Sequence, residues 1–337
     1  MSTSTSARAA WDSTPPRRRR PPVVVVVALV LLVPSVAATL LRVLAPSDDT
    51  GAMLASFVPY GVLTYALALV LLLLGLLVAR RRRPLVVLTV VVALLTGLHL
   101  SWLAPFFVPD HRPVVGPSFT VLTQNVYLGQ ADPDRLSQVA QGADVVVLSE
   151  TTRLFLRNLQ TPAWDARYPY AVGDLSGPPS DTTVFSRFPL TDAQLLARSV
   201  STQWIMTVEV PGREPVRLLG VHPCNPYCGG GAFAGDHAVL EAAVQANLSR
   251  PLMVAGDLNA IDDHAPLQRL RTDGLRSATD LVGAGWVPTY PANRAFPPLL
   301  PIDHVLVDDQ LTATSLRAVR MPGSDHLGLL ATIAGTD

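Results

Sequence analysis

The chain has 337 residues, of which 49% are hydrophobic and 15% are charged, and its formal net charge is zero. The charges are unevenly distributed: residues 1–109 carry ten Arg and three Asp, a net charge of +7, and the rest of the chain has a net charge of −7. An acidic second half argues against a sequence-independent binder of long nucleic acid, whose affinity comes mainly from basic side chains that neutralise phosphates.

Three apolar stretches in the first half are each long enough to cross a bilayer as a helix, which takes about 20 residues. They cover residues 22–44, 53–78 and 84–108. Residues 1–21, rich in Ser, Thr, Pro and Arg, are expected to form a disordered tail. A cleaved signal peptide is the alternative for the first stretch, but this stretch is longer than the apolar part of a signal peptide, and Arg42 closes it.

The orientation of these spans follows from Arg clusters at positions 17–20 and 80–83, because positive charge near membrane helix ends stays in the cytoplasm. We therefore expect a multi-pass protein of the plasma membrane with its N-terminus in the cytoplasm. The loop that contains Asp48 and Asp49, and all residues from 110 onward, then lie outside. Apart from Arg42, the spans carry no charged residue, so they are expected to act as an anchor and not as an ion path.

From residue 117 onward, short β-rich runs alternate with helical ones, a pattern typical of α/β or α+β domains. Asp132 is expected to cap a helix that starts at Pro133 and stops at Gly142, and a second helix is predicted over residues 235–248. Residues 204–210 and 216–221 are predicted to form a hairpin. Further strands are predicted over residues 118–126, 144–148, 182–186, 251–255, 301–307 and 327–333.

Polar side chains stand where these strands begin or end. In chain order they are Asn125, Glu150, His222, Asp257, Asn259, Asp303, Asp325 and His326. Loops at strand ends are where layered α/β domains build their sites, so we expect these side chains to converge. Carboxylates, amides and imidazoles are the groups that phosphoester hydrolysis needs, to bind a hard cation, position water and stabilise developing charge.

The chain resembles the endonuclease/exonuclease/phosphatase family in the segments that carry these residues, which are TQN, VVVLSE, VFSRFPL, VHP, MVAGDLNA, PIDHVLV and GSDHLGL. Each segment alone is weak, but seven in this order at strand ends are specific. The resemblance covers residues 117–335. It implies an α/β (α+β) four-layer sandwich of two packed mixed β-sheets flanked by helices, here preceded by three transmembrane helices as in a membrane-anchored bacterial form.

The resemblance also implies a metal site that holds Mg²⁺ or Mn²⁺. Glu150 resembles the family's metal-binding glutamate, Asn125 the neighbour that helps to set the metal or phosphate, and Asp325 a second carboxylate on the metal side. A structural interpretation competes for Asn125, Asp257 and Asp303, since Asn and Asp are favoured in turns at strand ends. Glu150 is harder to explain in that way, because an unpaired carboxylate after a buried strand is costly.

The same resemblance implies the catalytic groups. Asp257 resembles the aspartate that orients or deprotonates the attacking water, and Asn259 the amide that holds a phosphoryl oxygen. His326 resembles the histidine that contacts the scissile phosphate, with Asp303 as the carboxylate that fixes its tautomer and keeps it cationic. His222 resembles a histidine that acts as general acid or phosphate binder. The family differs internally on which group is the base.

Cys224 and Cys228 are the only cysteines and follow His222 closely. Outside the cytoplasm such a pair predicts a local disulfide. A zinc site made of both cysteines, His222 and His237 is the alternative, disfavoured because the chain has no second cysteine pair. His237 and His264 have no counterpart in the family segments, and we predict that both lie at the surface.

These observations predict an extracytoplasmic, metal-dependent phosphoester hydrolase of the phosphodiesterase or nuclease type, with a catalytic domain over residues 110–337 and an anchor over residues 22–109. Its substrate would be a nucleic acid or a phospholipid headgroup, and a phospholipid or lipid-phosphate hydrolase remains an alternative. The short segment between Glu150 and Thr182 lacks the long insertion that grips duplex DNA, which argues against DNA repair. A non-catalytic binding domain is disfavoured because no motif residue is missing. No protein partner is inferred.

Overall fold

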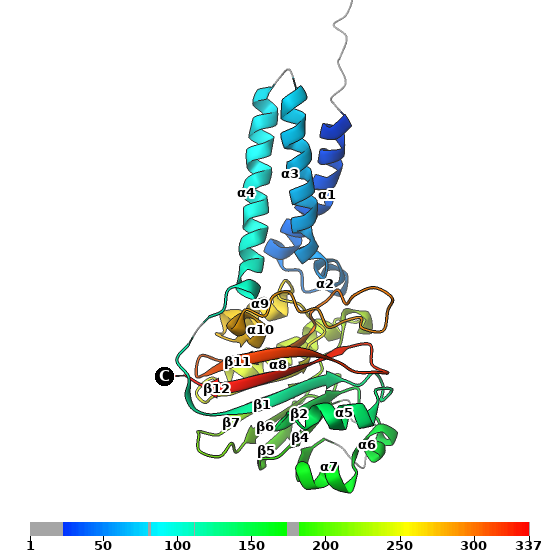
Figure 1. Ribbon diagram of the computed structural model, residues 1–337, viewed down its shortest axis with the longest axis vertical. Coiled ribbons are helices and arrows are strands. Elements are labelled where there is room, and N and C mark those ends of the chain that lie inside the picture. The colour runs from blue at the N-terminus through cyan, green and yellow to red at the C-terminus, as the bar shows by residue number, and fades with distance from the viewer. Residues whose placement is uncertain (1–22, 80–81, 111, 174–181, 337) are drawn as a thin grey trace, which may run out of the picture.

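The computed structural model describes residues 23–79, 82–110, 112–173 and 182–336, so the predicted tail over residues 1–21 lies outside the described residues. Helices α1 (Val23–Leu44), α3 (Gly61–Val78) and α4 (Arg82–Phe107) stand side by side and project from the rest of the molecule (Figure 1). The segments Val23–Leu44, Asp49–Val78 and Arg82–Phe107 are long and apolar enough to cross a membrane.

The sequence predicts one helix over the second apolar stretch, but the structure divides this stretch into separate helices. Helix α2 (Asp49–Ala55) is capped by the Asp48 side chain, which accepts a hydrogen bond of 2.9 Å from the Gly51 amide, and ends at Ser56. A 3₁₀ turn, η1 (Val58–Tyr60), then leads into α3. The prediction of a single helix from residue 53 was wrong because Pro59 has no amide hydrogen to continue the helix.

The remainder of the chain contains two mixed sheets of six strands each. The first has the order β11-β12-β1-β2-β4-β3 and the second has the order β5-β6-β7-β8-β10-β9. The first sheet consists of β1 (Val115–Asn125), β2 (Val145–Ser149), β3 (Tyr170–Val172), β4 (Thr182–Ser186), β11 (Leu311–Arg320) and β12 (Leu327–Gly335). The second consists of β5 (Leu190–Leu195), β6 (Trp204–Val208), β7 (Val216–Val221), β8 (Leu252–Asp257), β9 (Arg276–Ser277) and β10 (Asp303–Val307).

The two sheets pack face to face. Their central strands are buried on both faces, so one face of each sheet contacts the other sheet and the opposite face contacts helices. Val121 and Val147 of the first sheet share a buried cluster with Leu218 and Met253 of the second. The outer face of the first sheet packs on α5 (Pro133–Ala140), α6 (Arg153–Leu159) and α7 (Pro162–Arg167). The outer face of the second packs on α8 (Ala232–Gln245) and α9 (Ala265–Thr272). The predicted four-layer sandwich is therefore confirmed.

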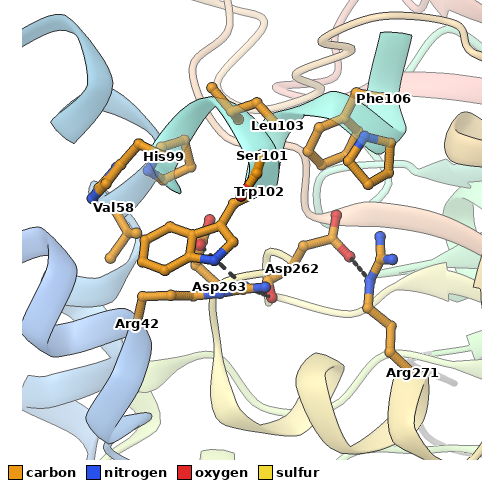
Figure 2. Close-up of a pocket in the computed structure, with 12 residues that line it drawn as sticks. Arg42, Val58, His99, Ser101, Trp102, Leu103, Phe106, Asp262, Asp263 and Arg271 are labelled. Carbon is orange, nitrogen blue, oxygen red and sulfur yellow. Dashed lines mark hydrogen bonds and ion pairs between the residues drawn. The ribbon is translucent and has the colours of Figure 1, made fainter. Parts of the chain in front are cut away.

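The apolar helices contact the sandwich through a polar cluster at the end of α1 (Figure 2). The Nη1 atom of Arg42 lies 3.1 Å from Oδ1 of Asp263 and also donates to the backbone oxygen of Asp262. The Arg42 guanidinium lies over the Trp102 ring of α4, 5.6 Å from its centroid. These residues line a cavity of about 170 Å³ between the helices and the sandwich. Arg42 therefore belongs to the junction between the apolar helices and the sandwich.

Two histidines that were predicted at the surface are instead buried, so that prediction was wrong. The His264 ring fills the contact between α2 and the sandwich, where its Nε2 donates to the Ala52 oxygen over 2.8 Å and its Nδ1 accepts from the Ile261 amide. His237 points from α8 into the core and packs edge-on against Phe233, with ring centroids 4.7 Å apart. Both positions depend on packing between distant segments, which residue type alone does not reveal.

Candidate functional site

The order of the strands brings the predicted polar residues to one edge of the sandwich. Strands β1 and β2 are parallel, as are β7 and β8, so the carboxyl ends of each pair point the same way. Asn125 ends β1, Glu150 follows β2, His222 follows β7 and Asp257 ends β8. Strand β10 runs antiparallel to β8, and its first residue, Asp303, pairs directly with Asp257. Both sheets therefore contribute to one site.

Asn125 joins the two sheets at this edge. Its Nδ2 donates to Oε1 of Glu150 and to Oδ2 of Asp257, each over 2.9 Å. Its Oδ1 accepts from the Tyr127 amide over 2.8 Å, and Oε2 of Glu150 accepts from the Leu128 amide over 2.9 Å. Asn125 lies in the predicted site, but its amide nitrogen faces both carboxylates. This orientation suits a residue that positions the carboxylates better than one that binds a cation directly.

Two imidazoles face the same aspartate. Nδ1 of His326 donates to Oδ2 of Asp303 over 2.8 Å, while its Nε2 lies 3.6 Å from Oδ2 of Asp257. Nε2 of His222 lies 3.7 Å from that oxygen and 3.9 Å from Oε1 of Glu150. Burial alone would lower the pKa of His326, but the charges of Asp303 and Asp257 outweigh it and raise the pKa to about 10. The ring is therefore cationic at neutral pH.

Asn259 and Asp325 complete the predicted set at this edge. The Asn259 amide donates to Oδ1 of Asp257 over 2.8 Å, and its Nδ2 donates to the Pro223 oxygen over 3.0 Å. Oδ1 of Asp325 lies 3.9 Å from Nε2 of His326. All eight residues predicted for catalysis or metal binding therefore lie together, whereas the role of each remains a prediction.

The backbone at this edge adopts unusual conformations. Glu150 has a φ of 58° and Asn259 a φ of 49°, in the left-handed region that costs an ordinary residue about 1 kcal/mol or more. Gly256 precedes Asp257, and a Cβ at Gly256 would lie 1.9 Å from the Val221 oxygen. Only glycine therefore lets β8 approach β7 closely enough at this point. Such strain is typical of functional sites, where surrounding structure holds it in place.

The site fits a divalent cation by its chemistry. Ligand atoms of Asp257, Asp303 and His326 lie within 4.8 Å of one another, and Oδ1 of both Asp303 and Asp325 is buried without a hydrogen-bond partner among the described residues. Burial, together with the charges of Glu150 and Asp257, raises the pKa of Asp325. Unpaired carboxylate oxygens and excess negative charge are what a hard cation such as Mg²⁺ would satisfy.

Among these groups, His326 is the least suited to bind the cation. Its Nδ1 already donates to Asp303, and a protonated imidazole has no lone pair to give to a metal. The carboxylates of the site are therefore better suited to hold a cation than His326 is.

Five of the eight predicted site residues line a cleft of about 430 Å³: Glu150, Asp257, Asn259, Asp325 and His326. Sequence reasoning missed two residues that shape it. The Tyr290 ring packs against His326 with centroids 4.9 Å apart, and no sequence pattern marks this position. The Ser324 hydroxyl donates to the Asn125 oxygen over 2.7 Å and accepts from the His326 amide over 2.9 Å. Its place beside Asp325 and His326 in the sequence was a usable signal.

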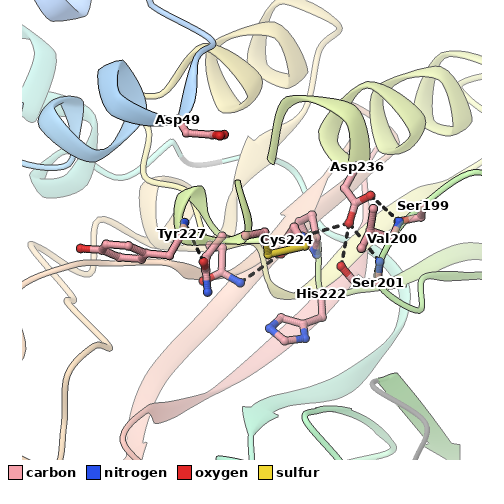
Figure 3. Close-up of a disulfide and its surroundings, with 12 residues drawn as sticks. Asp49, Ser199, Val200, Ser201, His222, Cys224, Tyr227 and Asp236 are labelled. Atoms are coloured by element: carbon pink, nitrogen blue, oxygen red, sulfur yellow. Dashed lines mark hydrogen bonds between the residues drawn. A yellow bond between two sulfur atoms is a disulfide. The ribbon is translucent and has the colours of Figure 1, made fainter. Parts of the chain in front are cut away.

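Cys224 and Cys228 form the predicted disulfide, in the loop after β7 (Figure 3). Because the two sulfur atoms are bonded to each other, they do not provide thiolates for zinc. His237 is buried against Phe233. The alternative of a zinc site is therefore not supported.

Asp236 of α8 ties the disulfide loop to the segment before β6. It accepts hydrogen bonds from the Val200 amide over 2.6 Å, from the Ser201 hydroxyl over 2.6 Å and from the Cys224 amide over 3.0 Å (Figure 3). Burial would raise the pKa of Asp236, but these hydrogen bonds outweigh it and lower the pKa. The loop and this segment enclose a second cavity of about 190 Å³, which Glu150, His222 and Asn259 also line. Glu150 and Asn259 line both cavities.

Comparisons with known structures agree with this fold. The crystal structure of humanized D. rerio TDP2 is 16% identical with a TM-score of 0.52, and the match covers 64% of this chain and 98% of that one. The human Nocturnin catalytic domain with bound sulfate is 16% identical with a TM-score of 0.52 and coverages of 67% and 97%. An endonuclease/exonuclease/phosphatase family protein from Bacteroides thetaiotaomicron is 15% identical, with a TM-score of 0.52 and coverages of 66% and 100%.

At such low identity these structures establish the fold alone. No curated protein matches the sequence. The sequence does match the Endonuclease/Exonuclease/phosphatase family over residues 122–326, which is more than half of the chain and includes every predicted site residue. The chain therefore belongs to the endonuclease/exonuclease/phosphatase family and has its phosphoesterase- or nuclease-like fold.

Proposed function

We propose that the chain is a membrane-anchored, divalent-metal-dependent phosphodiesterase that acts outside the cytoplasm. One observation carries the proposal: carboxylates from both sheets and a cationic imidazole converge on one cleft. Glu150, Asp257 and His326 come from distant parts of the sequence and all line this cleft. A non-catalytic binding domain has no need of such an arrangement, whose cost in desolvated charge is high.

The geometry supports a hydrolysis in which water attacks the phosphorus atom and an ester P–O bond breaks. Glu150 and Asp325 would hold a bound Mg²⁺ or Mn²⁺, which would neutralise charge on the phosphoryl oxygens. Asp257 orients the attacking water and accepts its proton, since burial raises the pKa of this carboxyl. The cationic His326 stabilises charge on the phosphoryl oxygens, and His222 faces the same position as a proton donor for the leaving oxygen.

The location outside the cytoplasm rests on the Arg clusters that flank the apolar helices and on the disulfide, which is typical of oxidising compartments. The division into an anchor over residues 22–109 and a catalytic domain over residues 110–337 is part of the same proposal. As substrate we consider a phosphodiester of nucleic acid or lipid. One similar structure is D. rerio TDP2 complexed with a single-strand DNA product, but the acidic second half of this chain disfavours long polynucleotides.

The test uses the full chain in dodecyl maltoside micelles, which contain no phosphate, with bis(p-nitrophenyl) phosphate as substrate. Hydrolysis should require Mg²⁺ or Mn²⁺ and stop with EDTA. Asp257→Asn, which keeps the shape of the side chain, and His326→Ala should each lower kcat by about two to four orders of magnitude. The exposed Asp309→Asn serves as the matched control and should behave as wild type. Metal-independent turnover, or turnover that survives both substitutions, would contradict the proposal.

A further inference from the structure

The catalytic cleft is not built by the sandwich alone. Met53, Ser56 and Phe57, which belong to the connection between α1 and α3, line the same cavity as Asp257 and His326. Figure 1 shows α2 lying between the long helices and the sandwich. One wall of the cleft therefore comes from the anchor.

This wall is fixed in place by hydrogen bonds on both sides of Phe57. His264 Nε2 donates to the Ala52 oxygen over 2.8 Å, and the Tyr60 hydroxyl donates to the Leu299 oxygen over 2.7 Å. At the start of α2, the Gly231 amide donates to the Asp49 carboxylate over 3.4 Å. Because these hydrogen bonds connect the segment to the sandwich at several points, the fold fixes the position of the segment in the cleft.

Part of the cleft lining consists of large, exposed side chains. Phe57 is 58% exposed, Leu128 is 64% exposed and Tyr227 is 83% exposed, and all three line the cavity. Large apolar side chains beside a group of carboxylates fit a ligand with both a phosphate and an apolar part. A polynucleotide, charged at every repeat, would leave these side chains without a partner.

The bilayer is the nearest source of such a ligand. Phe57 lies within the candidate span Asp49–Val78 and precedes Gly61, the first residue of helix α3, by four residues, which amounts to about 6 to 8 Å of helical rise. The phosphate of a lipid in the outer layer would therefore lie near the depth of the cleft, with its apolar chain on the anchor side.

We propose that the segment from α2 to η1 determines substrate specificity, and that the substrate is a phosphodiester of a membrane lipid. The apolar chain of the lipid lies against Met53 and Phe57. Its polar group occupies the smaller cavity beside the disulfide, on the other side of Glu150 and Asn259. This inference rests on the proposed function, because it names the substrate class of the same site.

The experiment compares two soluble esters, hexyl and methyl p-nitrophenyl phosphate, on the full chain in dodecyl maltoside with Mg²⁺ or Mn²⁺. They differ only in the apolar group, so the ratio of their kcat/KM values measures the apolar subsite. Phe57→Ala should lower this ratio about tenfold, mainly through the KM of the hexyl ester. Met53→Ala, the second variant, should lower it in the same direction. Phe57 is largely exposed, so its truncation leaves no core cavity.

Leu54→Ala is the matched control, because Leu54 belongs to the same segment and is 55% exposed but does not line the cleft. It should keep the wild-type ratio. If Phe57→Ala and Met53→Ala also keep it while both esters are hydrolysed, the lipid inference is wrong and the proposed hydrolase survives. If wild-type protein hydrolyses neither ester with either metal, the proposed function fails and the inference fails with it.

A second arm tests the bilayer as the source. The full chain is reconstituted in phosphatidylcholine vesicles that contain hexadecyl p-nitrophenyl phosphate, and release of nitrophenol is measured. We expect metal-dependent release that Phe57→Ala reduces about tenfold. Turnover of the hexyl ester without any turnover of the vesicle-bound ester would overturn the membrane as source.

Discussion

Asp303 contacts His326 and is not among the residues that line the cleft, so we predict that it acts as a positioning residue. Its Oδ2 accepts from Nδ1 of His326, so Nε2 carries the other proton and points toward Asp257. A neutral amide in its place would orient the ring less well and would no longer hold it cationic. Asp303→Asn should therefore lower kcat about a hundredfold or more with little change in KM.

A pH profile separates this role from a structural one. Since the carboxylates of Asp303 and Asp257 raise the pKa of His326 to about 10, wild-type activity should persist until the pH approaches that value. Removing the Asp303 charge lowers the pKa, so the alkaline limb of the kcat profile should move to lower pH. In combination with His326→Ala, Asp303→Asn should add little further loss. An unchanged alkaline limb would contradict the positioning role.

Asp308, at the opposite end of β10 from Asp303, gives a stability prediction. It is 2% exposed, its Oδ1 has no hydrogen-bond partner among the described residues, and burial raises its pKa from 3.8 to about 6. Between these two pH values the folded chain holds a proton that the unfolded chain releases, so stability falls as pH rises through this window. The loss then persists at higher pH.

Asp308→Asn removes this loss. The variant should have a higher Tm than wild type at about pH 7.5, and the difference should shrink at about pH 4.5, where Asp308 is already protonated. Thermal unfolding of the full chain in detergent, followed by Trp fluorescence, measures both. Asp309→Asn removes a neighbouring charge that also raises the pKa of Asp308, so it should raise Tm at the higher pH by less than Asp308→Asn does. If Asp308→Asn were less stable than wild type at the higher pH, the ionised Asp308 carboxylate would not destabilise the folded chain, and the prediction would be wrong.

At the scale of elements, the loop after β7 depends on its disulfide. The loop that the disulfide closes is small, so loss of the disulfide should lower the free energy of unfolding by about 2 kcal/mol on loop-entropy grounds. A larger effect is expected on the second cavity, which Cys224 and Cys228 line. Replacing both cysteines by Ser should clearly raise the KM for substrates with a large polar group, whereas it should lower Tm only modestly. Labelling with a thiol reagent should find two reactive thiols per chain after reduction and none before it.

Elements with a strong local pattern were predictable from sequence. The continuous apolar runs of β2, β8 and β10 and the Asp132 cap of α5 lie where the sequence predicts them, within a few residues. Strand β5 was not predicted, because five of its six residues are exposed and it shows no apolar alternation. Helix α8 begins at Ala232, three residues before the predicted start, since the glycines that precede it hide its boundary.

The candidate site divides in the same way. Its charged residues stand beside buried strands, so the chain order and the strand pattern were enough to group them. The Tyr290 ring, which packs on His326, and the wall with Met53 and Phe57 were not predictable, because they reach the cleft through tertiary packing and not through a local pattern. Met53 and Phe57 lie at least 200 residues before Asp257 and His326 in the sequence. His264 belongs to the same class, since its burial depends on α2.

At the scale of the whole molecule, the difference in net charge between residues 1–109 and the rest of the chain bears on the proposed membrane orientation. Of the ten Arg of residues 1–109, eight form two clusters in the sequence, at positions 17–20 and 80–83, and Arg42 lies at the junction between the apolar helices and the sandwich. In the topology that we propose, these clusters keep the helix ends beside them in the cytoplasm, and the acidic second half is exported. The ion pair between Arg42 and Asp263 would then hold the cleft at a constant depth above the bilayer, as the proposed lipid substrate requires.

The orientation is tested with reporters fused to the full chain. A phosphatase that is active only after export should be active when fused after Asp337, and a fluorescent protein that folds only in the cytoplasm should be dark there. Fusion after Ala79, between the second and third spans, should give the opposite pattern, because the Arg cluster at positions 80–83 keeps that loop inside. Replacing those four Arg by Asn should weaken the bias and yield mixed populations. A C-terminal phosphatase that is inactive while the Ala79 fusion is active would invert the topology, and the cleft would then face cytoplasmic lipids.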